Sequence, residues 1–147
     1  MKKMKKKGWF SLIYLLAISA GFYWVSPAPA MERVLIPRGS YLNIGPAELA
    51  AMLEKKDFLF VNVHIPYGGE IAKTDTHIPF NKIEENLEKF PQEKGEKTVI
   101  YCRSGPMSAV ASRTLVRLGY TNILNLVGGI RAWEKAGYHL VEGPKRE

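Results

Sequence analysis

Apolar stretches without a polar face recur along the chain, and they indicate strands that are buried on both sides. Each is rich in β-branched or aromatic side chains and is followed by turn-forming residues. They are FLFVNVH at 58–64, KTVIYC at 97–102 and TNILNLV at 121–127, with YLNI at 41–44 as a shorter candidate. The segment at 65–80 is rich in proline and glycine and is expected to be a long loop.

Segments with apolar residues at helical spacing alternate with these strands. The sequence predicts helices at 46–56, 81–90, 107–118 and 130–136, the first starting on Pro46 and the last directing Trp133 inward. The apolar stripe of the third helix comprises Met107, Val110, Ala111, Thr114, Leu115 and Leu118, and Ser108, Ser112, Arg113 and Arg117 are expected on its other faces. This alternation predicts an α/β fold of three layers, with a central, mostly parallel sheet and helices on both faces.

The chain has 147 residues, which is enough for one compact domain. We expect that domain at 41–142. The preceding segment, 31–40, is interpreted as a linker or a short lead-in strand.

The N-terminal segment has the pattern of an export signal. The first seven residues contain five lysines, residues 9–25 carry no charge, and SPAPA follows at 26–30 with its alanines spaced as A-x-A. This order is typical of a secretory signal peptide at 1–30 and predicts an exported protein in a periplasmic or other extracytoplasmic location. The alternative is an uncleaved membrane anchor formed by 9–25, since 17 residues of helix span about 25 Å.

The net charge of +7 is concentrated in that segment. Residues 1–30 hold five of the 21 basic residues and no acidic one, so 16 basic and 14 acidic residues remain for the rest of the chain. A basic patch or stripe on the folded domain is what nucleic-acid binding requires, and no block of basic residues follows Lys7. No nucleic-acid partner is therefore expected.

Cys102 is the single cysteine, and it stands where a predicted strand meets a loop and a helix. One cysteine cannot form an internal disulfide, so it is a buried apolar filler, an intermolecular link or a reactive thiol. In parallel sheets ligands sit beyond the carboxyl ends of the strands. There the helix N-terminus and inward-facing loop amides favour the thiolate, Arg103 adds a positive charge, and Gly105 lets the backbone turn.

The stretch from Tyr101 to Tyr138 resembles the second half of a single-domain rhodanese, a thiosulfate sulfurtransferase. The similarity lies in YCRSGPMS, in the LGY that follows the helix, and in the GG-x-x-x-W of Gly128, Gly129 and Trp133. Upstream, FLFVNVHIP and THIPF resemble further segments of that family, so the similarity covers about 41–140.

The resemblance implies a sulfane sulfur carried as a persulfide on Cys102. A donor such as thiosulfate supplies the sulfur, and cyanide, a small thiol or a thiol-bearing protein partner accepts it. It implies no metal and no organic cofactor. The residues implied in substrate and persulfide binding are Arg103, Ser104, Gly105, Pro106, Met107 and Ser108. The chain departs from the family at Met107, where many members have Arg or Lys, and at Asn62 and His64, while His77 matches a family histidine.

The sequence also bears on three other functions. The domain is alternatively a persulfide carrier or binding module without real turnover, which Met107 favours. A phosphatase or arsenate reductase needs an arginine six residues after the cysteine, and Ser108 stands there. A metal site built from His64, His77 and Cys102 lacks the ligand spacing of zinc sites.

Overall fold

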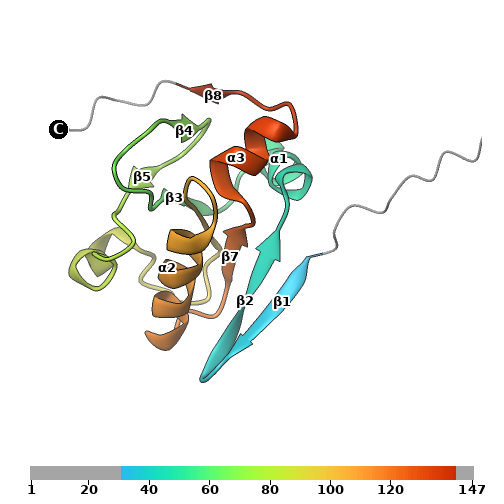
Figure 1. Cartoon of the computed structure of the whole chain (residues 1–147). Helices are drawn as coiled ribbons and strands as arrows, with labels where there is room; N and C mark the ends of the chain where they lie inside the picture. The colour runs from blue at the N-terminus through green and yellow to red at the C-terminus, as the bar shows by residue number, and fades with distance from the viewer. Residues whose placement is uncertain (1–30, 142–147) are drawn as a thin grey trace, which may run out of the picture.

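A computed structural model of the chain describes residues 31–141, and a six-stranded sheet forms its centre (Figure 1). The strands are ordered β1-β2-β7-β6-β3-β5, and every neighbouring pair is parallel except β1 with β2. Their bounds are β1 Glu32–Ile36, β2 Gly39–Ile44, β3 Leu59–Asn62, β5 Thr76–His77, β6 Thr98–Tyr101 and β7 Ile123–Leu126. The predicted α/β fold with a mostly parallel sheet is thus confirmed.

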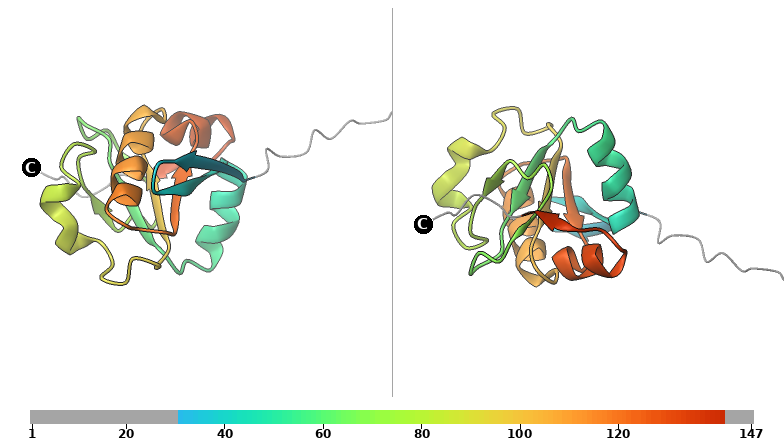
Figure 2. Two further views of the ribbon diagram at one scale, coloured as in Figure 1. Left: turned by 90° about the horizontal axis from the view of Figure 1, so that it is seen from below. Right: turned by 90° about the horizontal axis from the view of Figure 1, so that it is seen from above.

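Helices cover both faces of this sheet, as Figure 2 shows. One face packs against α2 (Pro106–Arg117) and against the short 3₁₀ helix η1 (Glu84–Lys89) with its flanking residues. The opposite face packs against α1 (Pro46–Glu54) and α3 (Gly129–Lys135). Two apolar clusters therefore sandwich the sheet, which gives the three predicted layers.

The alternation of side chains along β6 decides where the cysteine points. Ile100 belongs to the cluster on the α2 side, whereas Val99 and Tyr101 belong to the cluster on the α1 and α3 side. Cys102 follows Tyr101 and continues the alternation, so its side chain lies on the α2 face.

Residues 31–40 are not a linker; of the two interpretations, the lead-in strand is what the structure shows. β1 pairs antiparallel with β2 across a turn at Pro37 and Arg38, and β2 continues the sheet by pairing parallel with β7. The alternation of Val34 and Ile36, both packed against the α2-side cluster, explains why this segment is a strand.

The loop at 65–80 contains two short strands that the sequence did not reveal. β5 lies at the edge of the main sheet, and β4 (Glu70–Ile71) pairs antiparallel with β8 (Leu140–Val141) in a second, two-stranded sheet. The helix predicted at 81–90 is instead the short η1, because Asn86 has non-helical backbone angles. Ile83 and Phe90, which flank η1, are nevertheless buried.

The buried face of α2 differs from the predicted stripe. Ser108 and Ser112 are fully buried, whereas Val110 is 42% exposed. Small side chains let the helix axis approach the sheet closely, so the contact is centred on serine and alanine. A stripe chosen for hydrophobicity alone is therefore rotated away from the true contact face.

The export prediction concerns residues outside the described part of the chain. Both the signal peptide at 1–30 and the alternative anchor at 9–25 precede residue 31. Between residues 31 and 141, none of the helices has the length and apolar content needed to cross a bilayer.

Candidate functional site

Cys102 lies directly beyond the carboxyl end of β6, at the point where the chain turns into α2. The residue is 1% exposed and is part of the apolar cluster on the α2 side. The next two residues, Arg103 and Ser104, are exposed. The thiol therefore sits at the bottom of a short surface loop.

One loop amide points at the sulfur. The N–H of Gly105 donates to Cys102 Sγ, with 3.0 Å between nitrogen and sulfur. Gly105 has φ 111°, a conformation that L side chains disfavour, and this backbone reversal precedes the first helical residue, Pro106. Ser108 donates from its hydroxyl to the carbonyl of Gly105 at 2.9 Å, so the side chain fixes the loop.

The loop is braced from the side by the start of α3. The Ile130 N–H donates to the Cys102 carbonyl at 2.9 Å, and the Arg131 N–H donates to the Arg103 carbonyl at 3.0 Å. Gly129 makes this approach possible, because a Cβ on it would stand 2.1 Å from the Cys102 oxygen. The sequence shows Gly128 and Gly129 only as part of the GG-x-x-x-W motif, and the bracing of the cysteine is visible only in three dimensions.

Two histidines lie near the cysteine loop. His77 Nε2 is 2.7 Å from the His64 carbonyl oxygen, and the Tyr67 ring meets the His77 ring edge to face. Burial lowers the pKa of His64, and the positive charges of Arg103 and His77 lower it further. Arg103 and the two histidines thus lie close enough to interact, although the sequence placed the histidines on separate segments.

His64 contributes a ring nitrogen without a partner. Its Nδ1 is buried and has no hydrogen bond within the described residues. The His64 N–H donates to the Asn62 side-chain oxygen at 3.0 Å, so Asn62 holds the backbone of this segment.

Tyr101 anchors the opposite side of the same strand end. Its hydroxyl accepts from the Ile71 N–H at 3.1 Å and lies 2.7 Å from Thr74 Oγ1. Thr74 Oγ1 in turn donates to the Ile71 carbonyl. Burial raises the pKa of Tyr101 above its ordinary value, which keeps the hydroxyl protonated. The residue before Cys102 is thereby tied to the segment that contains β4.

The remaining predicted site residues surround the loop. Pro106 is exposed at the first turn of α2, and Met107 is half-buried against the α2-side cluster. Met107 therefore packs like a core residue and supplies no charge. Within residues 31–141, no group of three or more His, Cys, Asp or Glu side chains is placed to hold a metal ion.

The chain matches the family described as rhodanese-like domain over residues 45–136, and it belongs to that family. The resemblance noted in the sequence is thus confirmed. The matched region runs from the start of α1 to the end of α3 and contains the whole cysteine loop.

Relatives of known name agree with this assignment. A protein of Allochromatium vinosum named sulfurtransferase is 34% identical over 94 residues, which are 61% of this chain and 84% of that protein. An uncharacterized protein of Synechocystis sp. is 30% identical over 103 residues, 69% of this chain and 56% of the relative, so the chain spans about half of that relative's length. The family and the relative named sulfurtransferase support a sulfurtransferase-like role.

A solved structure of a rhodanese-like domain protein from Staphylococcus aureus has the same fold. It is 29% identical, with a TM-score of 0.57, and the match covers 69% of this chain and 98% of that structure.

Proposed function

We propose that the domain is a sulfurtransferase that carries a sulfane sulfur as a persulfide on Cys102. The observation that carries this proposal is the Gly105 N–H directed at Cys102 Sγ at the carboxyl end of a central strand. A backbone donor aimed at sulfur, next to the start of an α-helix, stabilises negative charge on that atom. In a persulfide the Gly105 N–H still contacts the inner sulfur, which is Cys102 Sγ. Its effect on the negative charge of the outer sulfur is therefore weaker.

The reaction follows from this placement in two displacements. The Cys102 thiolate attacks the outer sulfur of thiosulfate, the sulfur–sulfur bond of the donor breaks, and sulfite leaves with the bonding electrons. Cyanide or a thiolate then attacks the outer sulfur of the persulfide, and the Cys102 thiolate leaves. Atoms and electrons balance without an external oxidant or reductant.

Arg103 is the residue in our proposal that attracts an anionic donor to the loop. It is exposed, follows the cysteine directly, and its charge acts on His64 across the mouth of the loop. Met107 places no cation at the start of α2, so our proposal assigns the positive potential at the sulfur to Arg103 and the helix N-terminus.

The test is thiosulfate-dependent formation of thiocyanate from cyanide. We expect turnover by the full chain and none by Cys102→Ser, because a serine hydroxyl is not ionised near neutral pH. Circular dichroism of the variant checks that its fold is intact. Equal thiocyanate formation by the folded Cys102→Ser variant rules out the cysteine as the nucleophile.

A second candidate function is a persulfide carrier or binding module without turnover. One observation favours it: the apolar Met107 stands at the loop where a cation would help to hold an anionic donor. A carrier takes up sulfur from thiosulfate but releases no thiocyanate catalytically, and it passes the sulfur to a thiol-bearing protein. The same assay therefore separates the two functions.

The proposal includes an extracytoplasmic location. Its support is the run of lysines, the uncharged stretch at 9–25 and the small residues before Met31. Terminal sequencing of protein isolated from fractionated cells tests it. A mature chain that starts at Met31 in the extracytoplasmic fraction supports cleavage, an intact N-terminus in the membrane fraction supports the anchor, and an intact chain in the cytoplasm contradicts both.

A further inference from the structure

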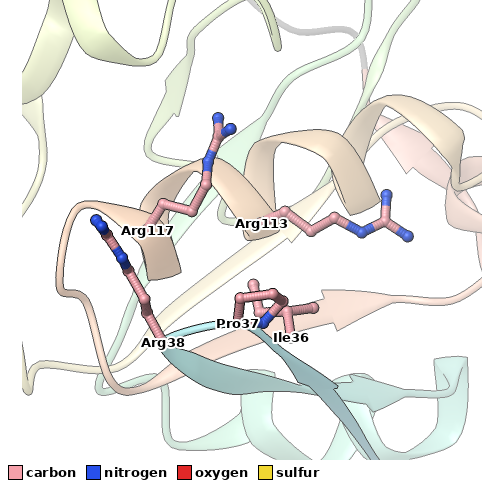
Figure 3. Close-up of a pocket in the computed structure, with 5 residues that line it drawn as sticks. All are labelled: Ile36, Pro37, Arg38, Arg113 and Arg117. Atoms are coloured by element: carbon pink, nitrogen blue, oxygen red, sulfur yellow. The ribbon is translucent and has the colours of Figure 1, made fainter.

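A pocket of about 360 Å³ lies between the β1–β2 turn and the C-terminal half of α2, away from the cysteine. Its lining residues are Ile36, Pro37 and Arg38 from the turn and Arg113 and Arg117 from the helix (Figure 3). Arg113 and Arg117 stand seven and 11 residues after Pro106, so the pocket lies roughly 10–16 Å along the helix from the cysteine loop. It is a separate feature of the molecule and does not depend on the chemistry proposed for Cys102.

The three arginines that line the pocket have no acidic partner among residues 31–141. Ion pairs in the described part of the chain join Lys56 to Asp75, Lys82 to Glu85 and Lys97 to Asp57. None of these pairs includes a pocket arginine, and the one hydrogen bond of the three joins Arg117 Nη2 to Thr114 Oγ1 at 3.1 Å.

Local structure disfavours these positions of the three arginines. Arg113 and Arg117 are four residues apart on one helix, where like charges repel. Arg38 has φ 76°, the left-handed region that residues with a Cβ rarely occupy. In Figure 3 the Arg38 and Arg117 side chains extend to the same side of the pocket, while Arg113 extends along its other end. A bound anion would offset the repulsion between Arg113 and Arg117.

The rest of the lining is apolar. Ile36 is half-buried, and Pro37 lies beside it at the base of the pocket. An inorganic oxyanion satisfies the guanidinium groups but leaves these two side chains uncovered. The pocket volume is in the range of small-molecule sites, and guanidinium groups bind carboxylates and phosphates through paired hydrogen bonds.

We propose that the pocket binds a small organic anion that carries two negative charges and an apolar body. The charged group lies between Arg38 and Arg117, the apolar body covers Ile36 and Pro37, and Arg113 neutralises charge at the other end.

Phenyl phosphate is a suitable probe, because it joins a dianion to an apolar ring, and calorimetric titration of the full chain measures its affinity. We expect saturable binding that Arg38→Gly weakens about tenfold or more, the effect of losing one hydrogen bond to a charged group. Glycine adopts positive φ readily, so this variant removes the charge and relieves the backbone. Thermal unfolding of Arg38→Gly at or above the wild-type midpoint verifies that the fold is intact.

Arg33→Gln is the matched control, because it removes one positive charge from the same hairpin at a residue that does not line the pocket. It should bind phenyl phosphate as the wild type does. Backbone NMR shifts on binding should concentrate at 36–38 and 113–117. The proposal is overturned by absent binding, by wild-type affinity in Arg38→Gly, or by an equal loss in Arg33→Gln. Inorganic phosphate binding as tightly as phenyl phosphate refutes the organic class.

Discussion

Gly129→Ala is the substitution that tests most sharply whether α3 braces the cysteine loop. Gly129 has φ 54°, and a Cβ there would stand 2.1 Å from the Cys102 oxygen and 2.9 Å from the Arg103 carbonyl carbon. Both are backbone atoms, so no side-chain rotation relieves the collision. Either α3 or the chain at Cys102 must move.

The cost follows from three contributions. Holding alanine at positive φ costs about 1–2 kcal/mol, and forcing atoms into a packed site costs about 1–3 kcal/mol. The hydrogen bonds to the carbonyls of Cys102 and Arg103 from Ile130 and Arg131 weaken as the segments separate, at about 1 kcal/mol each when lost. With both hydrogen bonds lost, we expect the free energy of unfolding to fall by about 4–7 kcal/mol in total, a large part of the 5–15 kcal/mol typical of domains.

Gly137→Ala is the matched control. Gly137 has φ 90°, yet a Cβ there meets nothing within 4 Å, so only the conformational cost of about 1–2 kcal/mol applies. Urea denaturation followed by circular dichroism measures both variants. Gly129→Ala should unfold at a clearly lower urea concentration and lose thiocyanate-forming activity. Equal midpoints for the two variants would refute the brace.

Three further predictions concern the surroundings of the cysteine. Tyr101→Phe leaves the Ile71 N–H without its acceptor and should lower the free energy of unfolding by about 1–3 kcal/mol in urea denaturation, and an unchanged midpoint contradicts the anchor. The pKa of His64 is lowered from 6.5, so His64 binds a proton more readily in the unfolded chain than in the folded one. The folded state should therefore lose stability as the pH falls from about 6.5 towards the lowered pKa. Melting curves recorded across that range should show a smaller loss for His64→Gln. Arg103→Ala should raise the KM for thiosulfate about 10- to 150-fold, which is the effect of losing one hydrogen bond to a charged group. An unchanged KM would mean that Arg103 faces solvent and does not bind the donor.

The sequence predicted the parts of the fold in which local pattern and burial agree. β3, β6 and β7 are buried on both faces and read as unbroken apolar runs, so their order with the helices fixed the fold class. Strand β1 was missed as a definite strand because its solvent side is polar or exposed and its turn contains Pro37. Such edge strands depend on pairing with a distant segment, here β7 through β2.

Only the part of the candidate site that is continuous in sequence could be predicted. The order of strand, cysteine, glycine loop and helix is continuous in sequence, and it led to Cys102 and Gly105. The support from Gly129 and the approach of His64 and His77 join segments 13 to 39 residues apart, and no local pattern encodes such contacts. The arginine pocket was missed for the same reason, since Arg38 meets Arg113 and Arg117 only after the hairpin folds onto α2.

Intact mass spectrometry after incubation with thiosulfate tests the central claim most directly. The folded full chain should gain the mass of one sulfur atom and lose it again on addition of cyanide, whereas Cys102→Ala should gain nothing. If the chain gains the sulfur atom but keeps it when cyanide is added, the domain is a carrier. An unchanged mass of the folded wild-type chain would mean that the buried thiol at the end of β6 serves only to pack the core.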